Sequence, residues 1–149
     1  MTEKKVLPPT YFFISLLLLV VLYLVFPIKT IIYYPWNLIG LIPGIAGAVL
    51  NMVADKEFKK AGTTAKPFQK SSTLITGNVF RISRNPMYLG MVLILISASM
   101  ITGSLSPFFI VPPFIIFMEN VFINVEEKML EEKFGEAWKN YKSKVRKWI

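Results

Sequence analysis

Residues 11–28, YFFISLLLLVVLYLVFPI, form an apolar run of 18 residues without a charged side chain. A helix needs about 20 mainly apolar residues to cross the hydrocarbon core of a bilayer, so this run is long enough for one span. Lysines precede the run, as in a secretory signal, but no small-residue cleavage site follows it. We therefore expect a retained membrane helix, and this helix sets the fold class of the chain.

Three further apolar runs cover residues 31–54, 87–102 and 107–125. The chain of 149 residues is 54% hydrophobic, which is more than a water-soluble domain of this size needs. We predict an all-α integral membrane protein with about four transmembrane helices, formed by a single domain over residues 1–149. Gly40 and Gly44 in the second run have the four-residue spacing that lets two membrane helices approach closely.

The segments outside the spans are polar. Residues 55–86 are predicted to form a loop with a helical start. In the apolar helix that precedes this loop, we expect a kink at Pro43. The tail, residues 126–149, predicts a cytoplasmic amphipathic helix or helix pair with a break at Gly135. Residues 103–107, GSLSP, are typical of a tight turn between the third and fourth spans.

Positive charges gather on one side of the predicted spans. Two lysines precede the first span, seven Lys or Arg lie in residues 55–84 and seven follow Glu119, whereas the opposite loops hold only Lys29. By the positive-inside rule, both termini and the middle segment are then cytoplasmic. The net charge of +8 is explained by contact with anionic lipids and does not require nucleic acid.

The sequence contains neither cysteine nor histidine. This excludes a Cys/His zinc site, a cysteine nucleophile and a Ser/His/Asp triad, and we expect no metal site. Any chemistry must use carboxylates, Arg, Lys, Asn, Tyr, hydroxyls or the backbone.

Two polar clusters lie beside apolar runs. In RNPMYLG, residues 84–90, Arg84 is either a basic flank that reaches lipid headgroups or part of an anion site with the free N–H groups of the helix start. Glu126 and Glu127 either mark the membrane exit or face a polar cavity. Glu119 lies seven residues before Glu126, so we expect these two to share a helix face, with Glu127 turned about 100° away.

Together, TGNVFRISRNPMYLG and EEKMLEEKFGEAWKNYKSKVRKWI resemble the superfamily of isoprenylcysteine carboxyl methyltransferases and phospholipid methyltransferases. That superfamily has R-(H/N)-P-x-Y-x-G before a membrane hairpin and E-E-x-x-L-x-x-x-(F/Y)-G-x-x-(W/Y)-x-x-Y after it. The fixed positions of both motifs are matched by Arg84, Asn85, Pro86, Tyr88, Gly90, Glu126, Glu127, Leu130, Phe134, Gly135, Trp138 and Tyr141. The resemblance extends from about residue 55 to the end.

The resemblance implies methyl transfer from S-adenosylmethionine to a lipophilic acceptor at the cytoplasmic membrane face. It implies cofactor contacts from Gly77, Arg84, Asn85, Pro86, Tyr88, Gly90, Glu126 and Glu127. Carboxylates suit the ammonium group or ribose hydroxyls of this cofactor, and arginine suits its carboxylate. Asparagine at position 85, where prenylcysteine enzymes usually have histidine, puts a prenylcysteine acceptor in doubt. The acceptor and the oligomeric state stay open.

Catalytic residues are not identified by these motifs. Glu119 is a candidate for taking a proton from an amine acceptor, and a purely structural role for it is an equal alternative. Two other functions fit parts of the pattern. A non-enzymatic scaffold or assembly protein would use the motifs as helix caps and lipid anchors. A sterol-reductase-like enzyme would use NADPH, but sterol reductases are much longer and the Glu126–Glu127 doublet favours a methyl donor.

Overall fold

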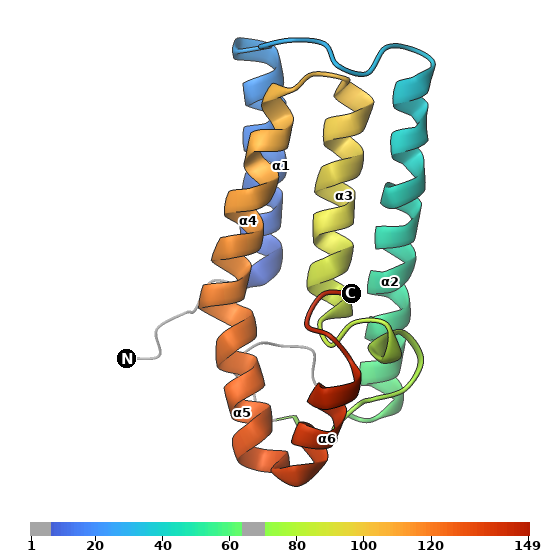
Figure 1. Ribbon diagram of the computed structural model, residues 1–149, viewed down its shortest axis with the longest axis vertical. Helices are drawn as coiled ribbons and strands as arrows, with labels where there is room; N and C mark the ends of the chain where they lie inside the picture. The colour runs from blue at the N-terminus through green and yellow to red at the C-terminus, as the bar shows by residue number, and fades with distance from the viewer. Residues whose placement is uncertain (1–6, 64–70) are drawn as a thin grey trace.

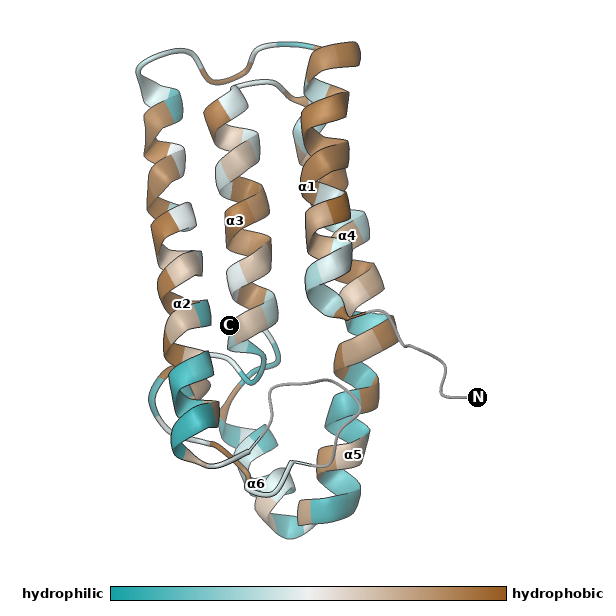
Figure 2. Cartoon of the chain, turned by 180° about the vertical axis from the view of Figure 1, so that it is seen from behind, coloured by the Kyte–Doolittle hydropathy of each residue, from teal (hydrophilic) through white to brown (hydrophobic). Residues whose placement is uncertain are grey.

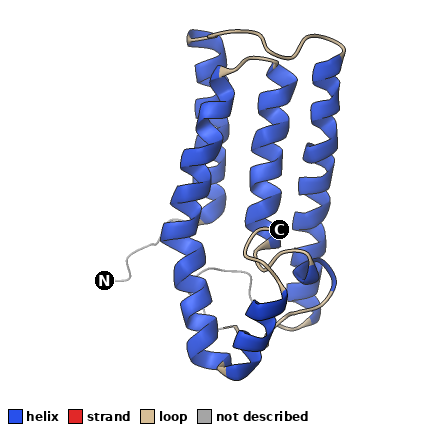
Figure 3. Ribbon diagram, viewed as in Figure 1, coloured by secondary structure: helices blue, strands red, loops and turns tan. Residues whose placement is uncertain are grey.

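Four apolar helical segments stand side by side in a computed structural model that describes residues 7–63 and 71–149 (Figure 1). They are α1, Pro8–Val25; α2, Leu41–Lys60; α3, Pro86–Thr102; and a long fourth segment that contains α4, Val111–Met118, and α5, Asn124–Phe134. The described residues form helices and loops without a strand, apart from one isolated bridge between Thr30 and Ser104 (Figure 3). The predicted all-α fold is confirmed.

Three segments are long and apolar enough to cross a membrane: Pro8–Val25, Trp36–Lys60 and Ser106–Phe134. The shorter α3, with 17 residues, lies among them (Figure 1). Figure 2 shows hydrophobic residues along most of the bundle and hydrophilic residues concentrated at the end where α2 stops and α5 and α6 lie. We call this the polar end. The N-terminal lysines and residues 64–70 of the predicted loop lie outside the described residues.

The second span differs from its prediction at both ends. A 3-10 turn, η1 (Trp36–Gly40), precedes α2, so residues 31–35 lie outside the helix, and α2 continues past Ala54 to Lys60. Pro43 lies in the first turn of α2, where a missing N–H removes little helical bonding. The irregularity near Pro43 is therefore a change of helix type just before it.

Small residues bring α2 and α3 into close contact. A Cβ atom added at Gly40 would lie 2.7 Å from the Met100 Cβ, and one added at Gly90 would lie 2.7 Å from the Gly47 carbonyl oxygen. Since such distances leave no room for a side chain, the packing role predicted for Gly40 and Gly44 is confirmed, and the partner is a helix of the same chain.

The turns at the ends of α3 follow from local sequence. Pro86 occupies the first position of α3, where its missing N–H costs nothing, and Gly103 ends the helix with a φ of 68°. Gly103 also makes backbone hydrogen bonds there. Its N–H donates one, and its carbonyl accepts one from the N–H of Ile31 at 2.8 Å. The predicted turn at residues 103–107 is confirmed as the α3 cap followed by a further 3-10 turn, η3 (Ser106–Ile110).

The tail is a helix pair that folds back onto the bundle. Gly135, with a φ of 49°, separates α5 from α6 (Glu136–Lys144), and the last residues then turn back to the start of α3 (Figure 1). Trp138 and Tyr141 of α6 are buried against Val79, Phe80 and Ala54. This second core, separate from the one inside the bundle, holds the polar end together.

Candidate functional site

A cavity of about 610 Å³ lies at the polar end. Its walls come from the first residues of α1, the end of α2, residues 71–75, the start of α3, and the helices α5 and α6. The volume falls within the roughly 300–1,000 Å³ of typical small-molecule sites. Its apolar lining includes Met87 and Met91 on successive turns of α3 and Met129 and Leu130 of α5.

Tyr88 and Glu126 form a hydrogen-bonded pair in this lining. The Tyr88 hydroxyl donates to Glu126 Oε1 at 2.8 Å, and the tyrosine is 7% exposed. Because a carboxylate has two oxygens and several lone pairs, Glu126 can still accept hydrogen bonds from a ligand. Asn85 and Pro86 line the same cavity, so the start of α3 and the first turn of α5 meet there as the motifs predicted.

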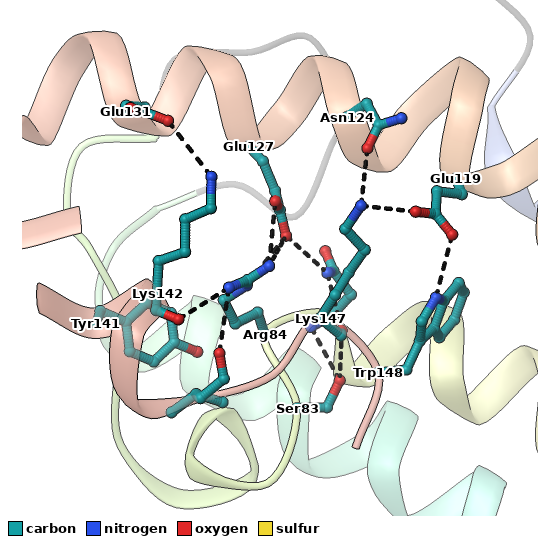
Figure 4. A network of polar contacts seen from close by, with 12 residues as sticks. Ser83, Arg84, Glu119, Asn124, Glu127, Glu131, Tyr141, Lys142, Lys147 and Trp148 are labelled. Carbon is teal, nitrogen blue, oxygen red and sulfur yellow. Dashed lines mark hydrogen bonds and ion pairs between the residues drawn. The ribbon is translucent and has the colours of Figure 1, made fainter. Parts of the chain in front are cut away.

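The Arg84 side chain is bonded mainly to other residues of the chain. Its Nη2 lies 3.0 Å from Glu127 Oε1 and its Nε donates to the same oxygen at 3.1 Å, with both side chains less than a tenth exposed. Its Nη1 donates to the backbone carbonyls of Lys142 at 3.1 Å and Val145 at 3.2 Å (Figure 4). The guanidinium also lies 5.8 Å from the centre of the Trp138 ring.

The carboxylate doublet is therefore divided between two surroundings. Glu126 lines the cavity, whereas Glu127 is absent from the lining and faces Arg84. Two of the other expected cofactor residues also lie away from it. Gly90 is buried against α2, and Gly77 lies before the short 3-10 turn Asn78–Arg81 and does not reach the cavity lining. Arg84, Asn85, Pro86, Tyr88 and Glu126 are the predicted residues that the fold brings together.

The prediction that Glu119 shares a helix face with Glu126 is wrong. Residues 119–123 form a π turn, η4 (Glu119–Ile123), within the fourth segment. Two α-helical turns take about 7.2 residues, and a π turn adds roughly one more. Glu119 therefore shares a face with Glu127, eight residues later, and not with Glu126. Figure 4 shows Glu119, Asn124 and Glu127 projecting from one side of this helix.

Glu119 contacts the end of the tail. It accepts from Lys147 Nζ at 2.6 Å and from Trp148 Nε1 at 3.4 Å, and it does not line the cavity. Lys147 and Trp148 escaped the sequence interpretation because their charge and size look like those of any membrane-flanking residue. The Lys147–Glu119 contact arises from tertiary structure, because the two residues lie 28 positions apart along the chain.

Tyr141 fixes the other end of the site wall. Its hydroxyl donates to the Phe80 carbonyl at 2.6 Å. Burial raises the pKa of Tyr141 to about 12, so the hydroxyl keeps its proton and its hydrogen bond at neutral pH. Phe58 and residues 74–75 complete the wall, although their separate sequence positions gave no sign of it.

The family model for phospholipid methyltransferases matches residues 36–137, which is more than half of the chain and includes the start of α3 and all of α5. The chain belongs to the phospholipid methyltransferase family. This family member is 38% identical over 63 residues to an uncharacterized protein of Haemophilus influenzae, a match that covers 42% of this chain and 100% of that protein.

Its fold is similar to a solved structure of the eukaryotic intramembrane Ras methyltransferase, isoprenylcysteine carboxyl methyltransferase. The TM-score is 0.70 at 25% identity, and the match covers 100% of this chain and 54% of the other. The chain thus spans about half the length of that methyltransferase. Family and fold together indicate an integral membrane protein of this superfamily and confirm the superfamily resemblance of the two motifs.

Proposed function

We propose that this family member transfers a methyl group from S-adenosylmethionine to a lipophilic acceptor. The observation that carries the proposal is the Tyr88–Glu126 pair in a largely apolar cavity of about 610 Å³. The second carboxylate oxygen of Glu126 suits the ammonium group or ribose hydroxyls of this cofactor. The Arg84 guanidinium is engaged by Glu127 and the tail. Lys133 also lines the cavity, and although it donates to the Ser71 carbonyl, its ammonium has further donors that suit the cofactor carboxylate.

The residues of the chain orient the reactants and exclude water. When bound, S-adenosylmethionine supplies an activated methyl group, whose bond to sulfur breaks as the acceptor's nucleophilic atom bonds to the methyl carbon. Met87 and Met91 form an apolar track along α3 into the bundle, which suits the hydrocarbon part of an acceptor. Such a cavity contributes to the rate by holding the acceptor and the methyl group in line.

We assign no proton transfer to Glu119. It is bonded to Lys147 and Trp148 and lies outside the cavity lining. A carboxylate or thiolate acceptor needs no base, and an amine must reach the cavity already deprotonated or lose its proton there.

The side of the membrane follows from charge. We infer that the polar end faces the cytoplasm, because it carries most of the lysines and arginines. Exposed cations such as Lys59, Arg81 and Lys139 surround it and suit the headgroups of anionic lipids.

The first prediction concerns Glu126→Gln, which keeps the shape of the side chain and removes its charge. We expect the affinity for labelled S-adenosylmethionine to fall about 10- to 100-fold, since a hydrogen bond to a charged group contributes roughly 1.5–3 kcal/mol. Equilibrium binding in detergent measures this, with Glu136→Gln as the matched control because Glu136 is 82% exposed. Absence of binding to the wild-type protein at millimolar cofactor, or equal affinity of both variants, would falsify the proposal.

A further inference from the structure

The last five residues, 145–149, form a segment that we call the C-terminal strap. It runs along the gap between the start of α3 and the fourth segment (Figure 4). Its residues do not line the cavity, so the strap lies behind the wall that Arg84 and Asn85 form. The strap can therefore affect a ligand in the cavity only indirectly, through the residues of that wall.

The backbone carbonyls of the strap accept hydrogen bonds from consecutive residues before α3. The Arg84 N–H donates to the Arg146 carbonyl at 3.1 Å. The Ser83 hydroxyl and the Asn85 Nδ2 donate to the Lys147 carbonyl at 3.2 Å and 3.1 Å. The strap is thus bonded to the chain immediately before the first residue of α3.

The side chains of the strap fasten it to the fourth segment. Lys147 Nζ donates to Glu119 Oε1 at 2.6 Å and to Asn124 Oδ1 at 3.0 Å, and Trp148 packs against the apolar core of the bundle. These contacts depend on the π turn, because it rotates Glu119 onto the face that meets the strap. The Lys147–Glu119 ion pair is the latch of the strap.

The strap fixes the orientation of the Asn85 side chain. Nδ2 of Asn85 donates to the Lys147 carbonyl and, at 3.4 Å, to Glu127 Oε1. Both partners can only accept, so the amide nitrogen must point toward them and the amide oxygen must point away. Asn85 is 9% exposed and lines the cavity, and no donor among the described residues is bonded to its Oδ1.

We propose that the latched strap is a positioning element that holds the Asn85 Oδ1 toward the cavity as a fixed acceptor for an N–H or O–H group of the bound cofactor. This deepens the proposed function and rests on it. Lys147 and Glu119 act through Asn85 and touch no ligand themselves. Releasing the latch frees the amide to turn, and a ligand donor then meets an unfixed group, which lowers affinity by a pre-organisation effect.

A charge swap tests the latch. Lys147→Glu places two carboxylates together and is expected to weaken S-adenosylmethionine binding roughly tenfold, whereas Lys147→Glu with Glu119→Lys restores the pair and brings affinity back to within about threefold. Lys144→Glu, an equal charge change at an exposed residue of α6, is the control and should bind like wild type. Hydrogen exchange of the Arg84 amide reports independently of any ligand whether the strap has detached.

The decisive measurement is a double-mutant cycle with Asn85→Ala. If the strap acts through Asn85, Lys147→Glu causes no further loss of affinity in the Asn85→Ala background. A full additional loss there, or wild-type affinity of a Lys147→Glu variant whose Arg84 amide exchanges fast, overturns the proposal while cofactor binding by the wild type stands. Failure of the wild type to bind the cofactor overturns the proposed function as well. If Lys147→Glu does not fold, Lys147→Met replaces it throughout the cycle.

Discussion

At the scale of single residues, neighbouring carboxylates have different surroundings. Glu126 meets a tyrosine hydroxyl in the cavity wall, whereas Glu127, one residue later, meets a buried guanidinium. The rotation of about 100° between adjacent helical residues is enough to send them to different partners. The proposed ligand contact of Glu126 and the structural contact of Glu127 can therefore be tested separately by substitution.

We predict that Glu127→Ala destabilises the fold more than it alters the cavity. It leaves the buried Arg84 without its counter-ion, a loss of about 3–5 kcal/mol in pairs of this kind. Thermal unfolding in detergent should show a clear fall in the unfolding midpoint, while Glu126→Gln should unfold close to wild type. Equal midpoints for Glu127→Ala and wild type would contradict the structural role.

At the scale of the elements, the contact between α2 and α3 positions the site. The cavity residues of α3 stand on a helix whose opposite face is pressed against glycines of α2. Gly90, although part of the RNPMYLG motif, belongs to this contact. The motif thus combines residues for a site with a residue for helix packing.

We predict that Gly44→Ala loosens this contact. The new Cβ would clash with the Ser97 Oγ, and such overpacking costs about 1–3 kcal/mol. Adding Ser97→Gly removes the obstructing atoms and should recover part of the lost stability. Gly77→Ala is the control, because a Cβ there meets no atom within 4 Å. Chemical unfolding that ranks Gly77→Ala below Gly44→Ala would refute the packing role.

At the scale of the whole molecule, the bundle has one polar end, and the cavity, both motif segments and α6 lie there. The opposite end consists of short loops that hold Lys29 as their only Lys or Arg. This asymmetry places the cavity on one side of the membrane, and under the proposed function the cofactor enters from that side.

The orientation can be checked with single introduced cysteines, since the chain itself has no cysteine that would be labelled. In intact cells, a membrane-impermeant maleimide should label Lys29→Cys and should label Ser143→Cys only after the membrane is opened. Both residues are exposed, so access depends on the side of the membrane. Labelling of Ser143→Cys alone in intact cells would reverse the inferred orientation.

The sequence by itself determined the elements of this protein. Apolar run length gave the membrane helices, because the thickness of the bilayer sets a length that can be counted. Gly135 and Gly103 marked helix ends, since both adopt a positive φ that side chains disfavour. The spacing of the two motifs also placed Tyr88 and Glu126 near each other, because a hairpin returns the chain to its starting side.

Only the tertiary structure decided which polar residues face the cavity and which hold the fold. A single π turn, which contains one residue more than an α-helical turn, rotated Glu119 away from Glu126. No residue type in residues 119–123 indicates that a π turn forms there. The strap then joined Lys147 to Glu119 and occupied the polar groups around Arg84. Contacts of this kind join residues far apart along the chain, so helical periodicity, which relates only neighbours within one helix, carries no information about them.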